Sequence, residues 1–245
     1  MLRSRSAACI LLVPVLFVVL VSTLACGGHS QGPVVRKFFV ASRMGDATTL
    51  ANLAMTSFDP STDGQVESLS IVSETPEEVV PLDLKSLVEA YRAAQKEEEE
   101  FTAKWDSYRQ INRDAIRTVR AADAKGLKLK GKDGVVQEEL AKWTADGESL
   151  TKKVSDARTA VARVRPLVEL SMRNPLKPVD PTAHEGELAT KEMRISANVK
   201  MPDGRSVKKD LVVTLQQARL KTPGGEMDGA WIITKIAEAE GGAKS

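Results

Sequence analysis

Two long stretches of helical periodicity fill the middle of the chain and constrain its fold most strongly. Side chains spaced three and four residues apart lie on one face of a helix, and a strict alternation of these steps is typical of coiled coils. The first seam is Leu84, Leu87, Tyr91, Ala94, Glu98, Phe101, Trp105, Tyr108, Asn112, Ala115, Val119 and Ala122, and the second is Val136, Leu140, Trp143, Gly147, Leu150, Val154, Ala157, Val161, Val164 and Val168.

These seams predict two helices, 84–124 and about 135–172, each about 60 Å long at 1.5 Å per residue. A Gly- and Lys-rich tip at 125–134 separates them, so we expect an antiparallel helical hairpin over 84–172. Glu98, Asn112 and Gly147 interrupt the apolar seams. We expect a bend, a docking contact or a departure from regular packing at these three positions. Pro166 predicts a kink near the end of the second helix.

The N-terminus resembles a bacterial lipoprotein signal at residues 1–25. Arg3 and Arg5 precede an apolar run at 10–21, and small residues lead to Cys26. The resemblance implies that Cys26 carries a lipid and begins the mature chain, although Thr23 stands where Leu is commoner. The alternatives are an ordinary signal peptide and an uncleaved anchor, which usually needs about 20 apolar residues. The non-acidic residue after Cys26 implies an outer-membrane lipoprotein facing the periplasm, if the cell has two membranes.

Charge and cysteine content exclude several classes of protein. Without residues 1–25, 33 basic residues balance 33 acidic ones, which argues against nucleic-acid binding driven by overall charge. The two cysteines are Cys9 and Cys26. Cys9 lies in the apolar run and would be removed with it, so the mature chain has neither a disulfide framework nor a thiolate metal site. We expect no cofactor.

The segments that flank the hairpin predict a split α+β domain at 33–83 and 173–239. A tether at 26–32 leads to a helix that opens at Pro33, and Asp46 is suited to cap a second helix. Residues 65–73 alternate as a half-exposed strand. After the hairpin, alternation at 193–201 and 211–215 and an apolar run at 231–236 predict three antiparallel strands, with turns at 202–204 and 222–229. Residues 240–245 form a tail.

This order of elements resembles the cone-shaped α+β fold of the nuclear-transport-factor-two-like superfamily, also called SnoaL-like or cystatin-like. The resemblance rests on the opening at 33–39, on Gly45-Asp46 with 50–53, and on the close Asp228-Gly229-Ala230-Trp231. It implies N-terminal helices packed on a curved antiparallel sheet. The long helical hairpin is then an insertion after the first strand.

Enzymes of that superfamily use an acid or a histidine in the cone, often with a tyrosine. Here Tyr91 and Tyr108 fall on the hairpin, and the inward strand positions are apolar. His184, with Glu185 and Glu187, is placed in a loop without a second histidine, which favours a solvated loop over a metal site. The acidic run Glu97 to Glu100 is interpreted as a solvated helix face, and the stripe of Phe101, Trp105 and Tyr108 as core packing.

The sequence therefore favours a non-catalytic, lipid-anchored envelope protein. It would bind a partner protein through the hairpin, or hold a small apolar ligand in the cone. One alternative is an isomerase or cyclase of the SnoaL-like kind, and another is a structural coiled-coil spacer of the envelope.

Overall fold

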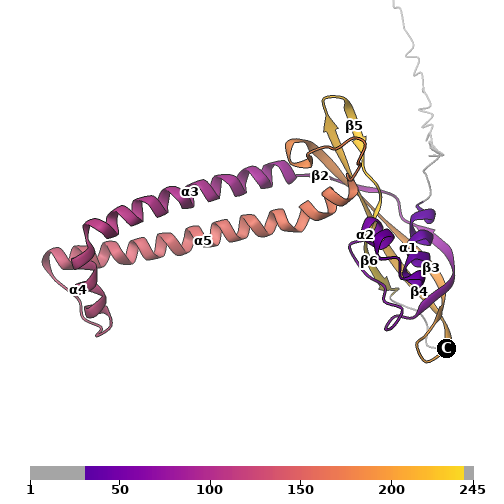
Figure 1. The fold of residues 1–245 in the computed structure, drawn as a ribbon, viewed down its shortest axis with the longest axis horizontal. Helices are drawn as coiled ribbons and strands as arrows, with labels where there is room; N and C mark the ends of the chain where they lie inside the picture. Colours follow the sequence, from indigo (N-terminus) through magenta and orange to yellow (C-terminus); the bar gives the residue numbers. More distant parts are fainter. Residues whose placement is uncertain (1–30, 240–245) are drawn as a thin grey trace, which may run out of the picture. The chain divides into compact units, whose positions relative to one another are not determined.

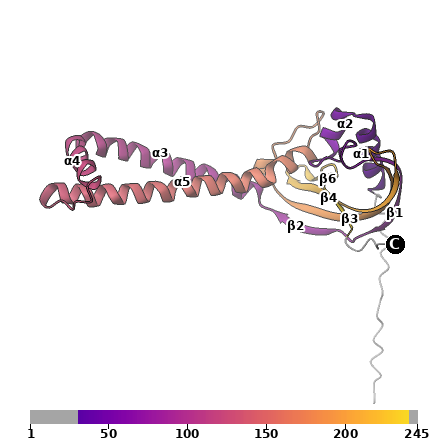
Figure 2. The ribbon, with the colours of Figure 1, turned by 90° about the horizontal axis from the view of Figure 1, so that it is seen from below.

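A computed structural model describes residues 31–239. These residues form an α+β fold with five α-helices and a curled, six-stranded antiparallel sheet (Figures 1 and 2). Residues 1–30 and 240–245 lie outside the described part. The predictions of a signal peptide, of lipidation at Cys26, of most of the tether and of the tail all fall there.

Two long strands form the centre of the sheet. β3 (Glu185–Lys200) and β4 (Ser206–Thr222) pair along their whole length, from Glu185 opposite Lys221 to Lys200 opposite Ser206. On the free edge of β3, β1 (Gln65–Glu74) and β2 (Glu78–Leu82) follow one another. On the free edge of β4, β5 (Gly225–Asp228) and β6 (Ile232–Glu238) do the same.

The concave side of the sheet is packed against the first helix. α1 (Gly32–Met44) carries Pro33 in its first turn and ends at Gly45, and α2 (Ala47–Leu53) begins where the Asp46 carboxylate accepts the N–H of Thr49 at 3.0 Å. Phe38 and Phe39 meet edge-on at 5.2 Å between ring centroids, and Phe39 meets Phe58 at 5.3 Å. The predicted inward strand positions pack against these rings: Met193, Ile195, Ala197, Val199, Leu211, Val213 and Leu215.

The strands differ from the prediction in three ways. β2 was missed, because no strand was predicted between residue 73 and the helical hairpin. Pro81 is tolerated there because β2 lies at a sheet edge. The helical segment therefore follows the second strand, not the first. β3 begins at Glu185, so Glu185 and Glu187 are strand residues, and the expected turn at 222–229 contains β5.

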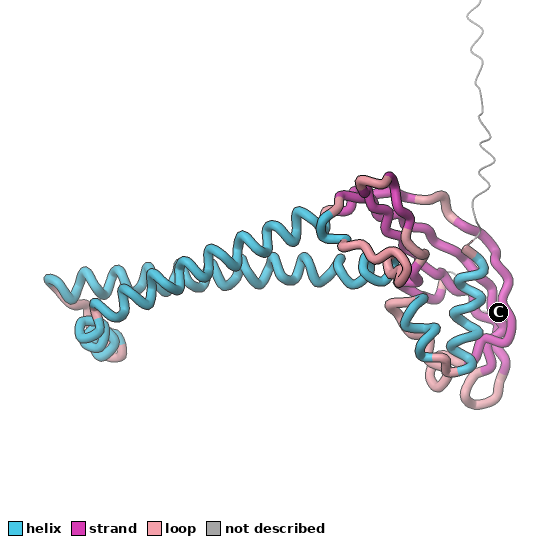
Figure 3. Tube along the Cα trace, turned by 45° about the horizontal axis from the view of Figure 1, so that its top comes forward, coloured by secondary structure: helices cyan, strands magenta, loops and turns pink. Residues whose placement is uncertain are grey.

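Two long helices run side by side and antiparallel (Figures 1 and 3). α3 spans Leu84–Ile111, and α5 spans Gly131–Ser171 and continues through Pro166. Every predicted seam residue is buried or half-buried, and most other residues between 89 and 160 are exposed. The heptad spacing thus identified the contacting faces of both helices.

The first helix is not continuous to 124 as predicted. It breaks at Asn112, and α4 (Arg113–Asp123) turns away from the direction of α3 (Figures 1 and 3). The side chain of Asn112 donates to the carbonyl of Tyr108 at 3.1 Å, a local bond that competes with helix continuation. The break lets Ile116 and Val119 pack against Val136 at the start of α5.

The last turn of α5 fills a gap in the sheet. β5 and β6 leave Gln217 and Ala218 of β4 between them, outside both pairings. The Ser171 hydroxyl accepts the N–H of Ala218 at 3.0 Å and donates to the carbonyl of Ala230 at 2.7 Å. The N–H of Ala230 in turn donates to the carbonyl of Ser171 at 2.7 Å. Ser171 is only 2% exposed, so these bonds are made without competing water.

Apolar contacts surround this joint. Leu84 and Val88 of α3 pack with Val161 and Val168 of α5 and with Leu220 of β4. Leu167 and Leu170 pack against Ile232 of β6. The helical pair is therefore attached to the sheet through its first and last turns.

We predict that Ser171→Ala lowers the free energy of unfolding by about 1–3 kcal/mol, because it leaves the buried N–H of Ala218 without an acceptor. Urea denaturation followed by circular dichroism measures the loss. Ser155→Ala is the matched control, since Ser155 is exposed on the same helix. Equal stability of the two variants would show that the hydroxyl bridge contributes nothing.

Candidate partner-binding groove on the helical pair

A groove of about 860 Å³ lies along the middle of the α3–α5 pair, away from the sheet. Phe101 and Tyr108 of α3 and Trp143 and Leu150 of α5 form its apolar lining. Ser149 and charged side chains of both signs form the rest: Glu97, Glu100, Lys104, Glu139, Lys142, Asp146 and Lys153. We call this feature the aromatic groove.

Four aromatic rings from the two helices pack together beneath and beside the groove, and three of them, Phe101, Tyr108 and Trp143, line it. Trp143 lies 5.0 Å from Phe101, 5.5 Å from Trp105 and 5.6 Å from Tyr108, measured between ring centroids. Trp105 and Tyr108 stack at 5.8 Å. All four side chains are half-buried, so their packing joins the helices, and Phe101, Tyr108 and Trp143 still leave ring surface at the groove. Core packing, the predicted role of the stripe, accounts for only part of their surface.

One seam interruption explains how the rings fit. A Cβ on Gly147 would lie 3.3 Å from the ring of Phe101, so glycine allows this ring to approach the backbone of α5. Beyond the ring, Lys153 and Glu97 form an ion pair across the two helices. Glu97, in the acidic run that was expected to be solvated, thus has a partner on α5, although its side chain remains more than half exposed.

Tyr108 has the most perturbed ionisation at the groove. Burial and, to a smaller extent, the Glu139 carboxylate beside it together raise the pKa of the Tyr108 hydroxyl to about 12. The hydroxyl is inaccessible to water. A neutral phenol is therefore fixed in the floor of the groove across the physiological pH range.

The structure does not bring the other candidate residues together. His184 caps the short 3₁₀ helix Pro181–Ala183, and Tyr91 packs in the apolar cluster at the base of the helical pair. Within residues 31–239, no three His, Cys, Asp or Glu side chains are grouped so as to hold a metal ion. The buried polar side chains of this part are Gln31, Ser42, Ser171 and Gln217.

No helix among the described residues is both long enough and apolar enough to cross a membrane. No family model matches the chain, and no curated protein or solved structure matches it significantly.

Sequence reasoning identified the aromatic stripe and the position of Gly147 but not the groove. The signal was present, since Trp143 occupies the seam of the second helix opposite Phe101, Trp105 and Tyr108. Heptad spacing alone does not show how much of each ring remains accessible. The joint at Ser171 was also missed, because nothing in the local sequence marks a serine as the acceptor for a strand 47 residues away.

The raised pKa of Tyr108 can be tested by titration. In Tyr91→Phe, Tyr108 is the only tyrosine of the chain, and we predict that its phenolate absorbance at 295 nm appears near pH 12. Adding Glu139→Gln should lower this midpoint without returning it to the ordinary tyrosine value of about 10, because burial is the larger cause. Ionisation near pH 10 in the parent variant would show that water reaches the ring.

Proposed function

We propose that this protein is a non-catalytic, lipid-anchored protein of the cell envelope, and that its helical pair receives a helix of a partner protein in the aromatic groove. The single observation that supports this role is the groove itself. It is long, apolar at its floor and charged at both rims, which are the features of surfaces that bind an amphipathic helix.

Aromatic residues in the floor strengthen the proposal. Tryptophan and tyrosine are enriched among the residues that dominate binding energy at protein interfaces. Trp143 is held by three neighbouring rings, so little side-chain entropy would be lost when a partner covers it. The mixed rim charges would then select the direction and register of the incoming helix.

The concave side of the sheet offers less support for ligand carriage. Phe38 and Phe39 are 0% and 3% exposed there and contact the inward residues of β3 and β4. We propose that the sheet and α1 form a cone-like domain of the nuclear-transport-factor-two-like kind, with the helical pair as a coiled-coil insertion. The filled concave side favours the partner-binding role over the apolar-ligand alternative.

Site-specific photo-crosslinking in the native cell tests the partner-binding role. A photoreactive residue at Asp146 or Ser149, both in the groove lining, should crosslink one envelope protein through a helical peptide identified by mass spectrometry. The same residue at Thr151, which is exposed outside the groove lining, should not. Phe101→Ala combined with Trp143→Ala should abolish the crosslink. A crosslink that survives this double substitution, or that forms equally from position 151, would contradict the role.

The anchor requires a separate experiment. We predict that the chain incorporates a clickable fatty acid in the cell, because Cys26 follows a lipoprotein-like signal, and that Cys26→Ala loses the label. Cys9→Ala, which changes the other cysteine of the chain, is the control and should keep it. Label retained in Cys26→Ala would exclude this cysteine as the lipid site.

A further inference from the structure

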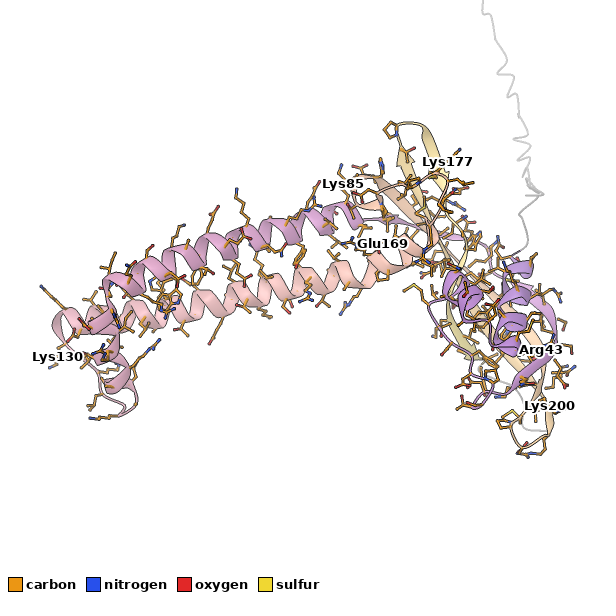
Figure 4. All side chains as sticks on the ribbon, in the orientation of Figure 1. Arg43, Lys85, Lys130, Glu169, Lys177 and Lys200 are labelled. Atoms are coloured by element: carbon orange, nitrogen blue, oxygen red, sulfur yellow. The ribbon has the colours of Figure 1, made fainter. Side chains whose placement is uncertain are left out.

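Positive charge is concentrated at the end of the helical pair that lies opposite the sheet. Residues 109–132 contain eight basic and two acidic residues, whereas the rest of the chain has 27 basic and 31 acidic ones. Figure 4 shows Lys130 at this end, whereas Lys85 and Glu169 lie at the end near the sheet. We call residues 109–132 the distal segment.

Four arginines of the distal segment line one cleft. Arg109 of α3 and Arg113, Arg117 and Arg120 of α4 face a cleft of about 490 Å³, which we call the arginine cleft. Its only acidic lining residue is Asp106. The break at Asn112 creates this cleft, because the change of direction between α3 and α4 places Arg109 beside the arginines of α4. The N-terminus of α4, which has no side-chain cap, adds a positive helix dipole at the same bend.

These arginines are poorly neutralised by the chain itself. Arg109 and Asp106 are 3.5 Å apart, and Arg117 and Asp114 are 3.7 Å apart, in both cases with exposed side chains. Such surface pairs contribute little. Within residues 31–239, Arg113 and Arg120 have no ion-pair partner. Guanidinium groups suit the two-oxygen geometry of phosphate, so the cleft is suited to a phosphate-bearing ligand.

Exposed apolar side chains at the same end indicate which kind of phosphate-bearing ligand binds. Ile111, next to the helix break, is 82% exposed, and Leu127, in the loop after α4, is 54% exposed. Neither residue belongs to an apolar cluster of residues 31–239. A soluble polyanion would leave both in water. An anionic bilayer would bind the arginines through its phosphates and accept the apolar side chains at its interface.

We infer that the distal segment docks on an anionic phospholipid surface, with lipid phosphates in the arginine cleft and Ile111 inserted at the headgroup level. The inference is independent of the partner-binding proposal, because the arginine cleft and the aromatic groove share no lining residue. Docking would hold the distal end at a membrane and leave the groove open to a partner.

Hydrogen exchange on the full chain, reconstituted into vesicles, tests this inference. With vesicles of phosphatidylcholine and phosphatidylglycerol, we expect residues 109–132 to exchange at least about tenfold more slowly than with phosphatidylcholine alone. Flotation confirms that each variant stays with the vesicles, so that exchange reports the distal segment and not the N-terminal anchor. High salt should remove the protection, because the attraction is electrostatic.

Two sets of substitutions make the test specific. Arg113→Gln, Arg117→Gln and Arg120→Gln together should abolish the protection, since each basic residue near the surface contributes about a factor of five. Lys152→Gln, Arg158→Gln and Arg163→Gln remove the same charge from exposed positions of α5 and should leave it intact. Ile111→Ser should reduce it.

Three results would overturn the inference. The first is equal protection on the uncharged vesicles, and the second is equal loss of protection in the two sets of arginine and lysine substitutions. The third is protection by soluble polyphosphate, added to the chain in phosphatidylcholine vesicles, without any protection by the anionic vesicles. That last result would assign the cleft to a soluble polyanion.

Discussion

One buried hydroxyl group fixes where the last turn of α5 meets the sheet. Neither β5 nor β6 pairs with Ala218 of β4. The backbone N–H of Ala218 therefore needs an acceptor from outside the sheet. Ser171, at the end of a 41-residue helix, supplies the acceptor and at the same time binds the backbone of Ala230 in both directions. A buried, unpaired N–H is costly, and this cost makes the position of α5 on the sheet specific rather than a matter of apolar contact alone.

Beyond this joint, the heptad spacing of the two seams determines how α3 and α5 pack together. The seam of α5 meets the seam of α3, first through Val161 and Val168 near the sheet and then through the four rings around Trp143. The described chain therefore has two regions. One is a packed α+β domain, and the other is an exposed helical surface with the aromatic groove and the arginine cleft. We regard the helical surface as the functional one, since the concave side of the sheet is filled by phenylalanine rings.

Much of this architecture is predictable from the sequence, because the spacing of apolar residues determines which face of each helix and strand is buried. The three-and-four spacing identified both contacting helix faces, and the alternation at 193–201 and 211–215 identified the inward strand residues. Features that depend on distant contacts were not predictable. The helix break depends on Asn112 and also on the contacts of Ile116 and Val119 with Val136 of α5, which are distant in the sequence. β2 forms because it pairs with the edge of β3. Its own sequence, which contains Pro81, argues against a strand.

The candidate sites show the same division. Phe101, Tyr108 and Trp143 were visible as aromatic seam residues, but the fraction of each ring left accessible depends on the packing around Gly147. The arginines at 109, 113, 117 and 120 were not singled out, because on a straight helix they form an ordinary solvated stripe. The bend at Asn112 turns that stripe into a cleft. The proposed membrane contact therefore depends on where the predicted helix fails to continue.

The most direct test of the account is hydrogen exchange at residues 167–171 in two glycine variants. A Cβ on Gly229 would lie 2.3 Å from the Ser171 hydroxyl oxygen and 2.7 Å from the Ser171 carbonyl oxygen, whereas a Cβ on Gly224 would lie 3.8 Å from its nearest neighbour. We predict that Gly229→Ala accelerates exchange in the last turn of α5 while β3 stays protected, and that Gly224→Ala changes neither. Unchanged exchange at 167–171 in Gly229→Ala would contradict the claim that this joint holds the helical pair on the sheet.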